Sequence, residues 1–139
     1  MISTTKKPQF SPTLSSIEAQ IFVSDVQASC DFYTHKLGFK VNFAYGNPPF
    51  YGQVYRDHAR VNLRLVTKPV FAGDIRTREG LLSATITVAT PAEIKQLFLD
   101  YRGAEVPFHQ SLRKEPWGAR TFVITDLDGN LILFAGPSD

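Results

Sequence analysis

Residues 121–134 read TFVIT-DLDGN-LILF, two apolar runs on either side of a polar turn of five residues. β-Branched and aromatic side chains dominate both runs, which favours strands. Asp128-Gly129 between such runs is a strong hairpin signal, and the length of the turn favours a bulged or longer loop over a two-residue one. The stretch from Pro116 to Asp139 therefore predicts an antiparallel strand pair at the end of the chain.

The composition is that of an ordinary globular protein with one domain. Of the 139 residues, 43% are hydrophobic and 20% are charged, and the net charge is +2. Lys and Arg are scattered along the chain, which argues against nucleic acid as a partner. No apolar run reaches the ~20 residues that span a bilayer, so no membrane is expected either. The single cysteine, Cys30, cannot form an intrachain disulfide, which favours a cytoplasmic location.

The N-terminal segment differs from the rest in composition. Met1 to Leu14 is rich in Ser, Thr, Pro and Lys and lacks the apolar core of a secretory signal. We therefore expect a flexible tail over residues 1–14 and a single domain over residues 15–139.

The first half of that domain predicts one strand, one helix and three further strands. Ile17 to Val23 alternates between apolar and polar side chains, as a strand with one buried face does. A helix is expected over residues 26–36, with Ser24-Asp25 as its N-cap, Gln27 in a possible capping box and Gly38 as a left-handed stop. Further strands are predicted over residues 39–44, 50–55 and 60–66.

The second half repeats this pattern after a linker over residues 67–80, which has no periodicity. A strand is expected over residues 81–88, and a helix opens at Thr90-Pro91-Ala92-Glu93, a capping box with Pro at the first helical position. Gly103 is predicted to end this helix, a strand follows over residues 104–108, and the final hairpin completes the unit. At an offset of 65 residues, matching positions are Val23 and Val88, Asp25 and Thr90, Phe32 and Leu97, Gly38 and Gly103, and Val41 and Val106.

This repeat, together with Pro116-Trp117-Gly118 and the Asp-x-Asp-Gly-Asn hairpin, resembles the glyoxalase/bleomycin-resistance/dioxygenase family of the vicinal oxygen chelate superfamily. The resemblance covers residues 16–137 and implies an α+β fold. Two tandem βαβββ modules, over residues 16–66 and 81–136, would form a curved mixed sheet around a cleft. It also implies a homodimer, in some members with a cleft shared between chains.

Strand alternation predicts which side chains face that cleft. On each strand the more uniformly apolar set is expected against the helices, and the other set faces the cleft. A polar face on several strands suits a wet cavity of ligand size, although any single polar side chain here has an equal claim to be a solvent-facing one. The ligand-binding candidates are Glu18, Gln20, Asn62, Arg64, Ser83, Thr85, Leu133 and, in the loop before the final hairpin, Trp117.

Metal-using members of the family carry ligands on the first and last strands of each module. The corresponding positions here are Glu18, Asn62, Ser83 and Leu133. One carboxylate, one neutral amide and one hydroxyl do not supply the roughly three protein ligands that a catalytic divalent ion needs. We therefore expect no metal and no cofactor, and a metal-dependent lyase or dioxygenase is disfavoured. No catalytic residue is assigned.

The remaining candidates for chemistry have simpler explanations. His35 is expected at the exposed end of the first helix, His58 in a turn and His109 at the start of a loop before Pro116. Cys30 lies between apolar helix positions with no base beside it, which favours packing over nucleophilic chemistry. Trp117 has two equal interpretations, a ring that stacks on a planar ligand and a cap on the sheet edge.

Two functions remain. The first is a metal-independent small-molecule-binding protein of the bleomycin-resistance type, with drug or toxin sequestration and thus antibiotic resistance as its role, and with a planar ligand. The alternative is a vicinal-oxygen-chelate enzyme, a lyase, isomerase or dioxygenase, with a reduced or shifted metal site. Bleomycin itself is a weaker candidate because it is cationic, whereas Arg64 opposes Glu18 here.

Overall fold

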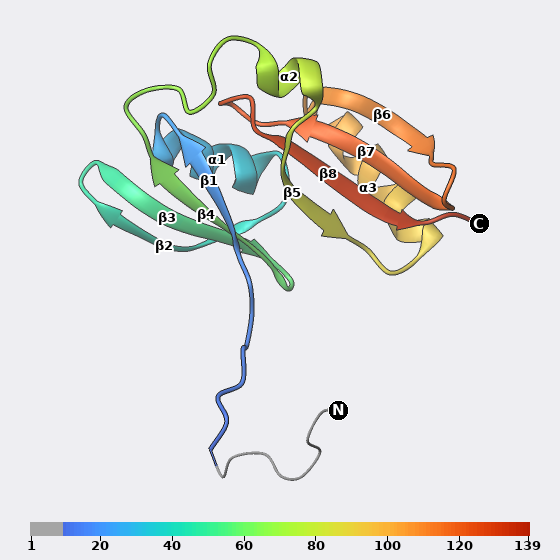
Figure 1. The fold of residues 1–139 in the computed structure, drawn as a ribbon, viewed down its shortest axis with the longest axis horizontal. Helices are drawn as coiled ribbons and strands as arrows, with labels where there is room; N and C mark the ends of the chain where they lie inside the picture. Colours follow the sequence, from blue (N-terminus) through green and yellow to red (C-terminus); the bar gives the residue numbers. More distant parts are fainter. Residues whose placement is uncertain (1–9) are drawn as a thin grey trace, which may run out of the picture.

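The computed structural model describes residues 10–139, which form two four-stranded sheets, each covered by a helix on one face (Figure 1). Residues 1–9 of the predicted tail lie outside the described residues, and residues 10–14 are exposed and outside any helix or strand. The first module comprises β1 (Ala19–Val23), α1 (Val26–His35), β2 (Lys40–Gly46), β3 (Pro49–Arg56) and β4 (Ala59–Leu65). The second module comprises β5 (Leu82–Thr87), α3 (Pro91–Gly103), β6 (Phe108–Lys114), β7 (Ala119–Thr125) and β8 (Leu131–Pro137).

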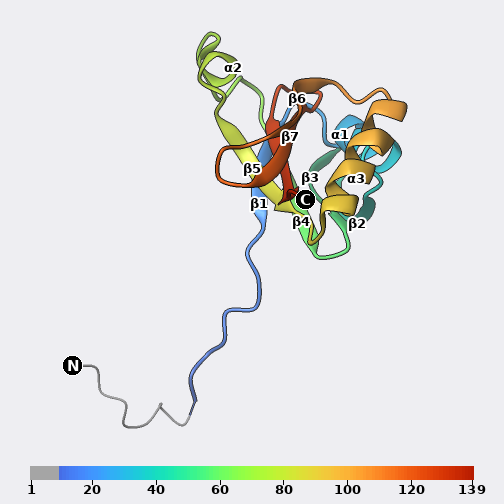
Figure 2. The ribbon, with the colours of Figure 1, turned by 90° about the vertical axis from the view of Figure 1, so that its right-hand side faces the viewer.

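Both sheets have the same strand order. The first is β1-β4-β3-β2 and the second is β5-β8-β7-β6. In each, the first strand pairs in parallel with the last, and the remaining pairs are antiparallel. This confirms the predicted α+β fold with two βαβββ modules. The strands β1 and β5 lie side by side where the modules meet, as Figures 1 and 2 both show.

The helix starts follow from their capping residues. Asp25 caps α1 and accepts a hydrogen bond of 2.9 Å from the Ala28 backbone N–H. The capping box proposed for Ser24 and Gln27 does not form, because the Ser24 N–H donates instead to Asp128 Oδ1. The N-cap predicted at Thr90 is confirmed, since Thr90 Oγ1 accepts from the Glu93 N–H at 3.1 Å. The Glu93 carboxylate accepts from the Thr90 hydroxyl at 2.9 Å, where a full capping box has a bond to the Thr90 backbone N–H.

The end of α3 differs from the prediction. Gly38 has the expected left-handed conformation, with φ +79°, but Gly103 lies within α3 and the left-handed residue is Glu105, with φ +61°. Backbone N–H groups of Glu105 and Val106 bond to the carbonyls of Arg102 and Tyr101, which ends the helix two residues later than Gly103 would.

Two other predicted boundaries were wrong. The strand expected over residues 104–108 begins only at Phe108, because the helix end and its turn occupy the preceding residues, and His109 therefore lies within β6 rather than at the start of a loop. The linker over residues 67–80 contains a short helix, α2 (Ile75–Glu79), which ends at Gly80 with φ +63°. Its lack of apolar periodicity concealed it, since none of its residues is buried.

The core lies between the sheets and the helices. The alternate residues predicted to face the helices do so in both modules: Ile21, Val23, Val61, Leu63, Ile132 and Phe134 are all buried in one cluster. The predicted parity of these strands is therefore confirmed. The opposite face of each sheet, called the open face below, carries Gln20, Asn62 and Arg64 in the first module and Leu133 in the second.

Candidate functional site

A chain of amide side chains crosses the open face of the first sheet. Asn42 Nδ2 donates to Gln53 Oε1 at 2.7 Å, and Gln53 Nε2 donates to Asn62 Oδ1 at 2.8 Å. Gln20 is the register partner of Asn62 on β1, and Tyr51 Oη donates to Gln20 Oε1 at 3.4 Å. We call Asn42, Gln53 and Asn62 the amide ladder. Its members hold one another in place across three strands, so a ligand would meet a pre-ordered polar surface.

Aromatic rings border the amide ladder on the side of β2. Phe43 stacks on Tyr45 with ring centroids 5.1 Å apart and lies 6.0 Å from the ring of Tyr51. Tyr45 is 58% exposed. An exposed, stacked aromatic group beside ordered amides suits a planar ligand, because the rings offer π faces and the amides offer hydrogen bonds.

Arg64 stands on the same face. Its register partners are Phe22 on β1 and Tyr51 on β3, so the guanidinium rises between two aromatic residues. Arg64 is exposed, and within residues 10–139 no carboxylate lies within ion-pair distance of it. An unpaired guanidinium can grip a carboxylate or carbonyl group with two hydrogen bonds.

A second part of the candidate site is a cavity of about 450 Å³ where β1, β4 and β5 meet, called the seam cavity below. Glu18 and Thr85, both predicted from the sequence, line it. Arg60 and His58 also line it, and Arg60 lies 3.9 Å from the Glu18 carboxylate. Sequence reasoning missed Arg60 as a site residue, although it shares the strand parity of Asn62 and Arg64.

Three predicted residues lie apart from these groups. Ser83 Oγ donates to Asn130 Oδ1 at 3.4 Å, beside an irregularity in the pairing of β5 with β8. Leu133 is half-buried and pairs with Thr85 and Val123. Trp117 is 74% exposed in the β6–β7 turn, at the far side of the second sheet from the first (Figure 1). The structure therefore does not bring Trp117 together with Gln20 and Arg64 in one chain.

The open face of the second sheet carries a buried carboxylate that sequence reasoning also missed. Glu115 Oε2 accepts hydrogen bonds from Thr121 Oγ1 at 2.7 Å and from Arg113 Nε at 3.0 Å. These bonds, that from Thr121 first, hold the pKa of Glu115 below its usual range. Gln110 Nε2 donates to Thr121 Oγ1 and extends the network to β6. Glu115 lies outside any alternating apolar pattern, so its burial could not be predicted from the sequence.

The four positions at which the family resemblance implies metal ligands do not fit a divalent ion here. The Asn62 oxygen is committed to Gln53, and the Ser83 hydroxyl is directed at Asn130. Glu18 is the one carboxylate among the four, and Leu133 has no donor atom. Within residues 10–139, no group of three or more His, Cys, Asp or Glu side chains is arranged to hold a metal.

The Asp126–Asn130 turn has a structural role. Asp126 accepts hydrogen bonds from the backbone N–H groups of Asp128 and Asn130, from Asn130 Nδ2 and from the Tyr33 hydroxyl of α1. Asn130 Nδ2 also donates to the Phe22 carbonyl of β1 at 3.1 Å. Burial raises the pKa of Asp126, and these hydrogen bonds oppose the rise. The Asp-x-Asp-Gly-Asn turn, from which the fold was predicted, thus joins the two modules.

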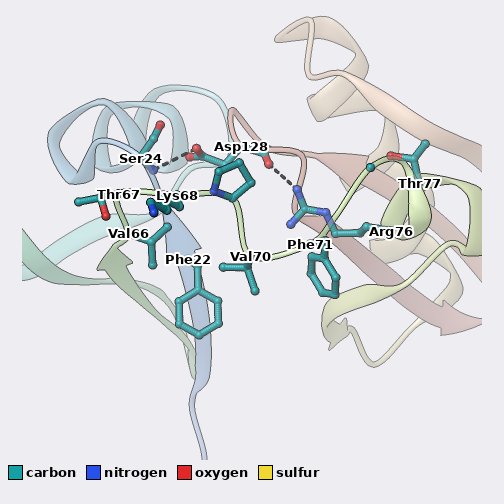
Figure 3. A pocket seen from close by; sticks show the side chains of 12 residues that line it. Phe22, Ser24, Val66, Thr67, Lys68, Val70, Phe71, Arg76, Thr77 and Asp128 are labelled. Carbon is teal, nitrogen blue, oxygen red and sulfur yellow. Dashed lines mark hydrogen bonds between the residues drawn. The ribbon is translucent and has the colours of Figure 1, made fainter.

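A cavity of about 300 Å³ lies beside this turn under the linker (Figure 3). Phe22 and Phe71 form part of its wall, and Arg76 lies over the Phe71 ring at 5.1 Å. Arg76 also donates to Asn130 Oδ1 and to the Asp128 carbonyl, and these two bonds hold its guanidinium against the turn. Polar side chains also line this cavity: Ser24, Thr67, Lys68, Thr77 and Asp128.

A family model for the glyoxalase/bleomycin resistance protein/dioxygenase superfamily matches residues 14–134. The chain belongs to this superfamily. No curated protein matches it. Members of the superfamily bind small molecules. Within residues 10–139, none of the helices has the length and apolarity to cross a membrane.

Solved structures share the fold. A glyoxalase/bleomycin resistance protein/dioxygenase from Alicyclobacillus acidocaldarius superposes with a TM-score of 0.73 at 20% identity, covering 90% of this chain and 92% of the other. A member of the superfamily from Sphaerobacter thermophilus gives 0.62 at 25% identity, covering 88% and 98%. The bleomycin-binding protein of Streptomyces verticillus, complexed with copper(II)-bleomycin, gives 0.66 at 19% identity, covering 93% and 99%. Identities of 19–25% establish the common fold and leave the ligand of this chain open.

Proposed function

We propose that this protein is a metal-independent small-molecule-binding protein whose ligand lies on the open face of the first sheet. One observation carries the proposal. The amide ladder is ordered by its own hydrogen bonds, and stacked aromatic rings and the exposed, unpaired Arg64 lie beside it on the same face. The ligand sequestered there would be a drug or toxin, held without chemical change.

The charges favour a planar ligand with a carbonyl or carboxylate group. Arg60 and Arg64 both rise from β4, and the Glu18 carboxylate lies 3.9 Å from Arg60. A cationic drug would meet two guanidinium groups at this face, which disfavours it. The copper(II)-bleomycin of the Streptomyces verticillus protein therefore supports the type of function rather than the identity of the ligand.

We further propose that the protein acts as a cytoplasmic homodimer. The open face of the first sheet exposes Tyr45 and the edge strand β2, so among residues 10–139 it lacks the cover of a helix. A second copy would supply that cover. Trp117, exposed at the far turn of the second sheet, would reach the ligand from the partner copy and restore the stacking role expected for it.

An enzyme with a shifted site is the second candidate. The seam cavity supports it, because Glu18 and His58 are both titratable and line the same space. Either group is able to accept a proton from a bound substrate. Such an enzyme would act by proton transfer without a metal at the four expected positions.

The test is a screen of planar carboxylates, planar neutral carbonyl compounds and planar amines by thermal shift, with and without added divalent metals. Ligands that bind the folded state raise the melting temperature by mass action. We expect stabilisation by the carboxylates and carbonyl compounds, independent of metal, and recovery of the unchanged compound afterwards. Stabilisation that requires metal would overturn the binding proposal, and turnover of a stabilising compound would favour the enzyme.

A further inference from the structure

The two modules differ in one turn, and the difference leaves a cavity. In the second module, five residues separate β7 from β8, and their turn packs against α1 through Asp126 and Tyr33. In the first module, only Asp57 and His58 separate β3 from β4. This shorter turn leaves the corresponding space beside α3 unfilled.

That space is a cavity of about 330 Å³, called the α3 cavity below. Its floor is formed by side chains of the core cluster, and they come from both modules: Phe39, Ile86, Val88, Leu97, Tyr101 and Phe134. Because these residues belong to the helix side of the sheets, the α3 cavity lies on the opposite side from the amide ladder. Its volume is at the lower end of the range for small-molecule pockets.

The rim of the α3 cavity is acidic. Asp57, Glu93 and Asp100 line it, and none of the three forms an ion pair with another residue in the range 10–139. Glu93 is hydrogen-bonded to Thr90, and Asp100 accepts from Gln96. These neutral donors leave the negative charge uncompensated.

The single arginine at the rim is committed to the protein. Arg56 Nη1 donates to the Leu37 carbonyl at 2.9 Å and lies 3.5 Å from the Tyr101 hydroxyl. It therefore holds the end of α1 against α3 and does not pair with Asp57, Glu93 or Asp100. Three carboxylates against one guanidinium give these four rim side chains a net charge of −2.

We propose that the α3 cavity binds an organic ammonium ion with an apolar body, at a site separate from the open face. The apolar part occupies the floor formed by Ile86, Leu97 and Phe134, and the ammonium group lies among the rim carboxylates. Burial of the apolar part removes hydrocarbon surface from water, and the carboxylates select the positive charge. Ligands of the two sites thus have opposite charge preferences.

The probes for this site are 2-phenylethylammonium, its neutral analogue 2-phenylethanol and its anionic analogue 3-phenylpropionate. Backbone amide shifts of the isotope-labelled protein are measured by NMR during titration with each probe. We expect saturable shifts from 2-phenylethylammonium at residues 57–59 and along α3, weaker shifts from 2-phenylethanol and none there from 3-phenylpropionate. Equal binding of all three, or shifts confined to the open face, would overturn the proposal.

Charge removal at the rim gives a second test. Asp57→Asn and Asp100→Asn are each expected to weaken 2-phenylethylammonium by about fivefold, the upper range for a solvent-exposed charge pair. Asp74→Asn on α2 is the matched control, because Asp74 is exposed and outside the cavity, and it should leave the affinity unchanged. Unchanged affinity in both rim variants, or an equal loss in the control, would contradict the proposal.

Discussion

The Tyr33 hydroxyl of α1 donates a hydrogen bond of 3.0 Å to Asp126 Oδ2, in the β7–β8 turn of the other module. A second tyrosine makes the reverse connection, since the Tyr101 hydroxyl of α3 donates to the Leu37 carbonyl of the first module at 2.9 Å. Both tyrosines are buried at the boundary between the modules. Each helix therefore contacts the half of the chain that it does not itself belong to through a buried tyrosine hydroxyl.

Tyr33→Phe is expected to lower the free energy of unfolding by about 1–3 kcal/mol, because a buried carboxylate loses one donor. Asp126 keeps Asn130 Nδ2 and two backbone N–H groups, so the fold should persist. Urea unfolding at neutral pH measures the change. Tyr45→Phe, at an exposed ring, is the control and should lie within about 0.5 kcal/mol of the parent. A loss in Tyr33→Phe no larger than in the control would contradict the structural role of this bond.

Two substitutions at the end of α3 are expected to raise the free energy of unfolding. Gly103 is helical, and a Cβ there would meet no atom within 4 Å, so Gly103→Ala should stabilise the protein by about 0.5–1 kcal/mol. Glu105→Gly should also stabilise it, by about 1 kcal/mol, because φ at Glu105 is +61°. Thermal unfolding measures both. Destabilisation by Gly103→Ala would mean that Gly103 is the left-handed stop that the sequence suggested.

Because two tyrosines are buried, we expect the folded protein to lose stability at alkaline pH. Burial raises the pKa of Tyr101 from 10.0 to about 12, and burial with the Asp126 charge raises the pKa of Tyr33 well above its usual range. Above pH 10 the unfolded chain therefore loses phenolic protons that the folded chain keeps, so the stability contributed by these groups is present below pH 10 and is lost as the pH rises toward 12.

Tyr101→Phe removes one of these groups. Its free energy of unfolding should fall less steeply between pH 10 and pH 12, by up to about 1.4 kcal/mol per pH unit relative to the parent. Urea unfolding at several pH values gives the slope. Tyr45→Phe again serves as the control, and an unchanged slope in Tyr101→Phe would show that its proton is released equally in both states.

Arg64→Met tests the proposed function. The substitution keeps the length of the side chain and removes its charge, so it should weaken a carboxylate ligand of the open face by about 1.5–3 kcal/mol. Arg78→Met on α2 is the matched control, because Arg78 is exposed and pairs with Asp74. Calorimetric titration with a carboxylate from the screen measures the affinity of both variants. Equal affinities in Arg64→Met and Arg78→Met would place the ligand away from Arg64.

Strand alternation was sufficient to predict the inward faces of β1, β4 and β8, because Ile21, Leu63 and Phe134 belong to regular period-two patterns. The start of α3 could also be predicted, because Thr90 and Glu93 have the three-residue spacing of a helix cap. Gly103 misled because the left-handed conformation belongs to Glu105, a residue type that rarely adopts it. The role of Asp126 could not be predicted, since its partner Tyr33 lies 93 residues away and only the packed fold brings them together.

The reciprocal tyrosine contacts have a consequence for how the protein comes apart. Since each helix has a buried hydroxyl whose acceptor belongs to the other half, separating the halves leaves polar groups without partners on both sides. Neither half then retains a complete core of its own, and partial opening costs nearly as much as complete unfolding. The duplicated architecture should therefore melt in a single cooperative transition, and a fragment cut within the linker should not hold its structure alone.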